Sequence, residues 1–278
     1  MNLALKMVAT VAVAYAAILL LVVWFQPKLV YFPQQGYGGI TPQAQGLAYE
    51  ALQIRTADGE QLAAWWIPAQ ASTPVRGTVL LFHGNAGNIS HRIDYAKMFY
   101  GMGYNTVLVD YRGYGESTGT PSEEGTYRDA AASWQWLTAT RGIKASEIVI
   151  FGESLGGGVA TWLAAQQTPR ALILASTFTS IPDLGAQVYP WLPARWISRI
   201  HYNNYANLEK IRAPVLIAHS PRDELIPYAH GRRLFEVARE PKAFLELSGG
   251  HNEGFVFARS EWVDAVQAFL RRHAATSM

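Results

Sequence analysis

The chain has 278 residues, a formal net charge of +2 and no cysteine. This length, without an internal repeat, favours one large α/β domain. The near-neutral charge and the lack of a Lys/Arg-rich tract among aromatic residues argue against a nucleic-acid partner. Without cysteine, the chain has no disulfide, no thiolate metal site and no cysteine nucleophile.

The N-terminal segment differs from the rest of the chain. Met7 to Phe25 contains no charged residue, and as a helix it would cross the roughly 30 Å hydrocarbon core of a bilayer. No small-x-small cleavage site follows, which favours an uncleaved anchor over a signal peptide. We therefore expect residues 1–26 to form a single-pass transmembrane anchor. Lys6 and the amino terminus outweigh Lys28 alone, which favours a domain on the exoplasmic or periplasmic side.

The anchor is followed by a change in composition. Residues 27–48, rich in Gly, Pro and Gln over most of their length, are expected to form an irregular linker, and residues 49–278 the folded domain. Two strand-like runs, 49–55 and 61–67, flank Asp58-Gly59, which is a strong hairpin signal. These first two strands should therefore be antiparallel.

Strand-like and helix-like segments then alternate. We expect strands at 78–82, 104–110, 147–151, 171–175, 214–219 and 243–247, and helices near 90–101, 122–140, 154–167, 228–239 and 258–273. Such alternation implies a mostly parallel sheet with helices on both faces. Residues 176–208 interrupt the pattern with prolines and aromatic clusters. That segment is expected to form a short lid-like insertion over the carboxyl ends of the strands.

The most informative motif is Gly152-Glu153-Ser154-Leu155-Gly156, which stands between a predicted strand and a predicted helix. A serine in such a tight corner is strained and exposes its Oγ above the sheet, while the glycines let strand and helix pack closely. We therefore predict that Ser154 is a nucleophile. The pattern recurs around Ser117, but there Pro121 follows and no helix can begin promptly. Ser117 is predicted to be a structural loop serine.

A serine nucleophile needs a base within hydrogen-bond reach. His251 follows the last predicted strand, among glycines, at the carboxyl ends of the strands where active groups gather on such sheets. We predict that His251 is the base. His219 also ends a strand but precedes the candidate acid, and His83 is expected to be a hydrogen-bonded loop residue.

The base needs a third group that fixes its tautomer. Asp223 follows the strand ending at residue 219 and gives the chain order Ser, Asp, His that is expected for this type of hydrolase. Asp183, in the loop after the 171–175 strand, is the competing acid. Glu224, one residue further on, is expected to point elsewhere.

A tetrahedral intermediate also needs preorganised N–H donors for its oxyanion. One should be the backbone N–H of Leu155, at the start of the helix after Ser154. The other is predicted to be the backbone N–H of Asn85, in the loop after the 78–82 strand. The alternative interpretation of that loop is a plain glycine-rich turn.

With these residues in place, the chain resembles the serine hydrolases of the α/β-hydrolase superfamily, and more narrowly their Bem46-like group of membrane-anchored members. The resemblance covers about residues 45–270 and supports the three predicted catalytic residues. It rests on His83-Gly84-Asn85-Ala86-Gly87-Asn88-Ile89, Asp110-Tyr111-Arg112-Gly113-Tyr114-Gly115, Gly152-Glu153-Ser154-Leu155-Gly156-Gly157, Arg222-Asp223 and Gly250-His251-Asn252.

The expected function is hydrolysis of carboxylic esters or thioesters of apolar acyl groups, with no metal or cofactor. Trp191 and Trp196, in the lid-like segment, are predicted to line an acyl pocket or to cover the sheet. Alternatives on the same catalytic groups are amide or peptide hydrolysis and acyl transfer. A non-catalytic, membrane-tethered binding protein is the alternative from a different class.

Overall fold

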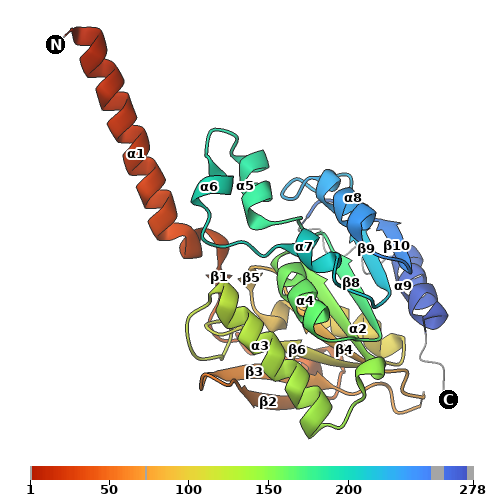
Figure 1. Cartoon of the computed structure of the whole chain (residues 1–278). Helices are drawn as coiled ribbons and strands as arrows, with labels where there is room; N and C mark the ends of the chain where they lie inside the picture. The colour runs from red at the N-terminus through yellow and green to blue at the C-terminus, as the bar shows by residue number, and fades with distance from the viewer. Residues whose placement is uncertain (1, 73, 252–259, 274–278) are drawn as a thin grey trace.

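The apolar runs of the sequence form the strands of one sheet. In the computed structural model, which describes residues 2–72, 74–251 and 260–273, these strands are β2 (Glu50–Arg55), β3 (Gln61–Ile67), β4 (Thr78–Phe82), β6 (Asn105–Val109), β7 (Ile148–Glu153), β8 (Ala171–Ala175), β9 (Val215–His219) and β10 (Lys242–Glu246). Their order across the sheet is β10-β9-β8-β7-β4-β6-β3-β2 (Figure 1).

Strand directions follow the prediction. β3 pairs antiparallel with both β2 and β6, and the other neighbouring pairs are parallel. In the described part of the sheet, β3 alone therefore runs against the other strands. The β2–β3 hairpin turns at Asp58-Gly59, where Gly59 has a φ of 96°. A mostly parallel sheet with an antiparallel N-terminal hairpin is confirmed.

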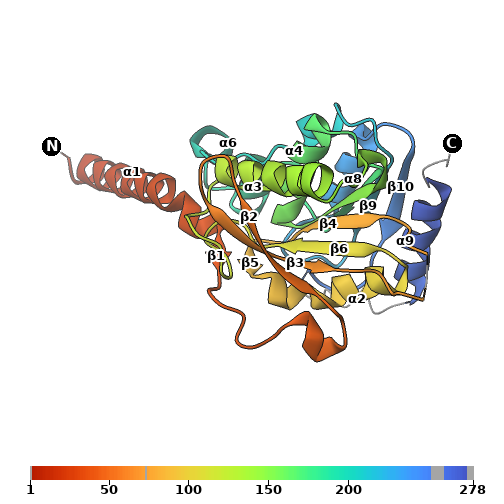
Figure 2. The ribbon, with the colours of Figure 1, turned by 90° about the horizontal axis from the view of Figure 1, so that it is seen from below.

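Helices cover both faces of this sheet (Figure 2). α3 (Glu123–Gln135), α4 (Leu155–Gln166) and α8 (Tyr228–Val237) pack on one face, and α2 (Ile93–Gly101) and α9 (Ser260–Arg272) on the other. The predicted start of the last helix, residues 258 and 259, lies outside the described residues.

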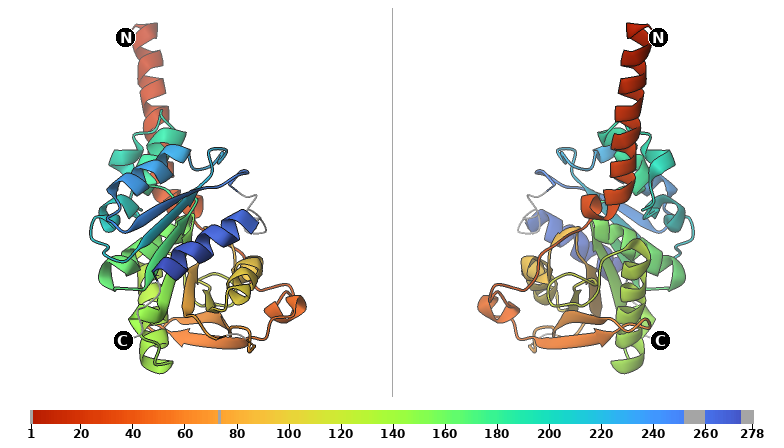
Figure 3. Two further views of the ribbon diagram at one scale, coloured as in Figure 1. Left: turned by 90° about the vertical axis from the view of Figure 1, so that its right-hand side faces the viewer. Right: turned by 90° about the vertical axis from the view of Figure 1, so that its left-hand side faces the viewer.

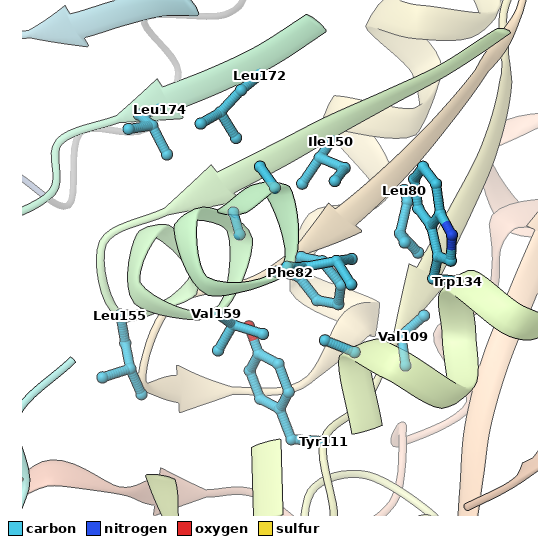
Figure 4. Packing of buried hydrophobic residues seen from close by; sticks show 14 of the residues in the cluster. Leu80, Phe82, Val109, Tyr111, Trp134, Ile150, Leu155, Val159, Leu172 and Leu174 are labelled. Carbon is cyan, nitrogen blue, oxygen red and sulfur yellow. The ribbon is translucent and has the colours of Figure 1, made fainter. Parts of the chain in front are cut away.

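The side chains of the central strands are buried on both faces, because alternate residues point to opposite sides of a strand. Leu80 and Ile150 face α3 and α4, whereas Val79 and Val149 face α2 and α9. Figure 4 shows the first layer, with side chains from strands, helices and the following loops: Leu80, Phe82, Val109, Tyr111, Trp134, Ile150, Leu155, Val159, Leu172 and Leu174. This packing fixes the carboxyl ends of β4, β7, β8 and β9 relative to one another.

The 176–208 segment contains three short helices, α5 (Ile181–Val188), α6 (Ala194–Ile197) and α7 (Asn204–Leu208). α7 packs against α4 and α8, whereas α5 and α6 pack against each other. α5 and α6 stand away from the sheet, beside the N-terminal helix (Figure 1).

The N-terminal helix is longer than the predicted anchor. α1 runs from Leu3 to Val30 and passes through Pro27, whose carbonyl accepts the N–H of Tyr31 and so closes the last turn. The helix is long and apolar enough to cross a membrane, and it projects from the domain (Figure 3).

The segment predicted as an irregular linker also has order. A short strand, β1 (Phe32–Pro33), pairs parallel with β5 (Ala86–Gly87), and a 3-10 turn spans Pro42–Gln45. Such a two-residue strand has no signal in the sequence, because it exists only through its partner.

Ser117 has the structural role predicted for it. Its side chain is buried, its Oγ donates to the Asp110 carbonyl at 2.9 Å, and it accepts the Ala63 N–H at 2.9 Å. The serine thus joins β3 to the loop after β6.

We expect Ser117→Ala to lower the free energy of unfolding by about 1–3 kcal/mol, because the buried Ala63 N–H would lose its acceptor. Urea denaturation of the full chain in detergent micelles measures this, with the exposed Ser72→Ala as control. Equal stability of the two variants would contradict the role of the Ser117 hydroxyl.

Candidate active site

Ser154 occupies a strained corner between β7 and α4. Its φ of 52° and ψ of −117° lie outside the regions that most residues with a side chain adopt. The flanking glycines make the corner possible. A Cβ on Gly156 would lie 2.1 Å from the Phe82 carbonyl oxygen, and one on Gly152 would lie 2.5 Å from the Gly156 carbonyl oxygen. Only glycine at these two positions lets the helix start directly behind the strand.

The structure brings Ser154, His251 and Asp223 into one chain of contacts. His251 Nε2 lies 3.1 Å from Ser154 Oγ, and His251 Nδ1 lies 2.8 Å from Asp223 Oδ2. An ionised carboxylate can only accept, so the Nδ1 of His251 carries the proton of the neutral ring. The Nε2 atom is then an acceptor that faces the serine hydroxyl.

Asp223 is held as an anion. Its Oδ1 accepts the N–H groups of Leu225 at 3.0 Å and Ile226 at 2.8 Å. Burial by itself would raise the pKa of this carboxyl, but hydrogen bonds from His219 and His251 hold the pKa well below its usual range. The group that orients His251 is therefore charged at neutral pH.

His219 is a second imidazole on this carboxylate, which the sequence reasoning set aside. Its Nε2 lies 2.8 Å from the Ile226 carbonyl oxygen and 3.4 Å from Asp223 Oδ2. Both neighbours accept hydrogen bonds, so Nε2 carries the proton. The sequence signal that could have indicated this contact is the spacing of four residues between His219, at the end of a strand, and Asp223.

Glu224 also has a role that the sequence reasoning missed. One of its carboxylate oxygens, Oε2, accepts the backbone N–H of His251 at 2.9 Å. Asp223 thus holds the ring of His251 while Glu224 holds its backbone. Adjacent acids on one turn therefore fix the same histidine from two sides.

Asp183, the competing acid, lies elsewhere. It stands in the first turn of α5, where its carboxylate accepts from Arg195 at 2.9 Å and its N–H donates to Ser180 Oγ at 3.2 Å. The structure brings Asp223, not Asp183, to His251.

The loop after β4 lies directly over the nucleophile. A Cβ built on Gly84 would be 3.5 Å from Ser154 Cβ. His83 Nδ1 lies 2.7 Å from the Gly84 carbonyl oxygen, so this nitrogen carries a proton and fixes the carbonyl. In a trans peptide the N–H points opposite to the carbonyl, so the same contact fixes the direction of the Asn85 N–H.

His83 is itself buried and enclosed. Its Nε2 faces the Asp110 carboxylate at 3.4 Å, and its ring packs against Tyr111 and Tyr114 with centroids 4.5 and 5.3 Å apart. The prediction of a hydrogen-bonded loop histidine is confirmed.

Leu155, the other predicted oxyanion donor, is the first residue of α4. The first N–H groups of a helix have no partner within it. The helix start thus offers a backbone donor at the residue after Ser154.

Trp191 and Trp196 lie on the outer surface of the lid-like segment, with 55% and 91% of their area exposed. The acyl-pocket role of these two side chains stays a prediction. Among residues 2–72, 74–251 and 260–273, no group of three or more His, Asp or Glu side chains could hold a metal ion.

Comparison with known proteins agrees with the fold. The family model described as α/β hydrolase fold matches residues 77–210. An esterase of Pyrococcus furiosus superposes with a TM-score of 0.72 at 21% identity, covering 88% of this chain and 98% of that one.

Several relatives are closer in sequence, including these two. Protein bem46 of Schizosaccharomyces pombe is 36% identical over 73% of this chain and 71% of its own length. The lysophosphatidylserine lipase ABHD12 of Danio rerio is 34% identical over 83% of this chain and 72% of its own. The fold and these relatives support a hydrolase, and the chain belongs to the Bem46-like group of the α/β-hydrolase family.

Proposed function

We propose that the protein is a serine hydrolase that cleaves carboxylic esters or thioesters of apolar acyl groups. The observation that carries this proposal is the unbroken chain of contacts from Ser154 Oγ through His251 to Asp223, at 3.1 and 2.8 Å. A strained serine with an unprotonated imidazole nitrogen beside it is the arrangement that acyl transfer to a hydroxyl requires.

The reaction would proceed in two halves. Ser154 Oγ attacks the acyl carbonyl while His251 Nε2 takes the hydroxyl proton, and the anionic Asp223 stabilises the imidazolium. The intermediate collapses to an acyl-serine, and His251 returns the proton to the departing alcohol or thiol. Water then attacks the acyl-serine with the same base, which releases the acid and restores the hydroxyl.

The oxyanion of each tetrahedral intermediate would be bound by the N–H groups of Leu155 and Asn85. Leu155 offers its donor at a helix start, where the helix dipole adds a partial positive charge. The Asn85 donor depends on the Gly84 carbonyl being held by His83. Preorganised donors of this kind lower the barrier because they need no reorientation during the reaction.

The apolar elements beside the domain support the proposal that the protein recognises its substrate by an acyl chain. An apolar helix and an aromatic-rich segment lie next to each other beside the domain (Figure 1). We propose that α1 anchors the domain to a membrane, where lipid-like esters concentrate. A lysophospholipid, the substrate class in the name of one relative, carries one apolar acyl chain in a carboxylic ester beside a polar head and fits this proposal.

Ser154→Ala should lower turnover of p-nitrophenyl esters of graded chain length by several orders of magnitude, since only the oxyanion donors and binding remain. The same variant should lose labelling by a fluorophosphonate probe. Ser117→Ala, within the second copy of the motif, is the control and should keep both. Undiminished labelling of Ser154→Ala would refute the nucleophile, and a wild-type chain with neither labelling nor turnover would favour a binding protein.

Asp223→Asn should cut turnover by roughly ten-thousand-fold, because the amide favours the wrong His251 tautomer while keeping the geometry. Asp183→Asn is the matched control, since it neutralises the competing acid that pairs with Arg195, and it should have little effect. Reversed effects of the two variants would move the acid to α5.

His83→Phe should lower kcat about 10- to 100-fold with little change in KM, because the Asn85 donor would lose its fixed direction and oxyanion donors act in the transition state. His83→Asn should recover part of the loss, since its side-chain NH2 can reach the Gly84 carbonyl. A rise in KM at unchanged kcat, or equal losses in both variants, would exclude this positioning role.

A further inference from the structure

The end of α5, the connection that follows it and α6 carry an exposed apolar surface. Val188, Tyr189, Trp191 and Trp196 have 44%, 52%, 55% and 91% of their area exposed. Single exposed apolar residues are ordinary, but a cluster of large ones marks a contact surface. We name residues 188–197 the α5–α6 tip.

The tip lies along α1. The Tyr15 hydroxyl donates to the Trp191 carbonyl at 2.7 Å, and Gln26 Nε2 donates to the Ile197 carbonyl at 2.7 Å. Tyr15 and Gln26 are 11 residues apart, which is about 16 Å of helix. The views in Figures 1 and 3 agree in placing α6 beside α1.

One face of α1 is docked against the domain at this level. Leu19, Val22 and Val23 are half-buried and Gln26 is buried, at the spacing of one helix face, whereas Trp24 is 77% exposed. Gln26 Oε1 also accepts the Arg199 N–H at 2.7 Å. The polar contacts at both ends of the tip hold it in register with the helix.

The depth of the tip follows from this register. Tyr15 is near the middle of the uncharged stretch 7–25, and Lys28 lies 13 residues further on, about 20 Å along the axis. If α1 crosses a bilayer, a segment bonded to Tyr15 reaches the hydrocarbon with it.

The backbone of the tip is suited to the hydrocarbon of a bilayer, because several of its polar groups are absent or already paired. Pro190 and Pro193 have no backbone N–H to satisfy, the Leu192 N–H donates to the Tyr189 carbonyl at 2.9 Å, and the Trp191 carbonyl takes the Tyr15 hydroxyl. Lipid demands such internal pairing of backbone polar groups. The one charged side chain of the tip, Arg195, pairs with Asp183 at 2.9 Å, and Arg199, just past α6, can extend its charged end towards the headgroups.

We propose that the α5–α6 tip inserts into the bilayer leaflet next to the domain and forms, with α1, a two-element membrane contact. The lid-like segment would then be immersed in acyl chains, not only held near them. This inference rests on α1 crossing the membrane and is independent of the hydrolase reaction.

The lack of cysteine allows a direct test. Trp196→Cys and Tyr189→Cys are each labelled with a nitroxide in the full chain, in phosphatidylcholine nanodiscs that hold one copy. Collision rates with oxygen and with a polar nickel chelate are measured by electron paramagnetic resonance. Val11→Cys on the exposed α1 surface is the lipid reference, and Lys144→Cys on the exposed domain surface is the water reference.

We expect nickel collision rates at residues 189 and 196 about tenfold below that at residue 144, because a polar nickel chelate is largely excluded from hydrocarbon. Rates nearer to the water reference at both positions would overturn the proposal. A water-exposed label at residue 11 would overturn it too, together with the anchor. Shielding that occurs only in discs with two copies would assign the surface to self-association and overturn the lipid contact.

Discussion

The loop of residues 83–89 sets the main constraint on this structure, because His83, Gly84, Asn88 and Ile89 are buried and their polar groups must find partners. Asp110 supplies several of these contacts. Its carboxylate accepts the Ile89 N–H and the Tyr37 hydroxyl, each at 2.9 Å, and faces the His83 ring. A Cβ on Gly115 would lie 2.0 Å from the same carboxylate. The position of the Asp110 carboxylate therefore explains why residue 115 is a glycine.

The same loop connects the candidate active site to the N-terminal helix. The Asn85 carbonyl accepts the Phe32 N–H at 2.9 Å and the Tyr114 hydroxyl at 2.8 Å, and the Asn85 side chain donates to the Val30 carbonyl at 3.1 Å. Asn88 adds hydrogen bonds to residues 34 and 36. The last turn of α1 is thus hydrogen-bonded to the residue proposed to supply an oxyanion donor, so the orientation of α1 bears on the geometry of that donor.

The sequence predicted what depends on local pattern. The apolar strand runs and the strand–serine–helix corner are patterns of consecutive residues. Ser154, Asp223 and His251 each follow a parallel strand, and the carboxyl ends of such strands meet at one edge of the sheet. Features made by tertiary contact were missed. β1 exists only because β5 lies beside it, and α1 continues through Pro27 because its last turn is fixed from outside. Glu224, expected to point elsewhere, reaches the His251 backbone across a turn.

The charge of Asp223 links stability to the geometry of the base. Because the folded-state pKa of Asp223 lies below its unfolded value of about 4, the ionised carboxylate stabilises the fold above that unfolded value. The contribution is lost as pH falls from there towards the lower folded pKa. Protonation would also place a hydroxyl donor on a group that, when ionised, only accepts, and this would weaken the acceptor that fixes the tautomer of His251 through Nδ1. Orientation of the base and stability of the fold therefore depend on the same buried anion.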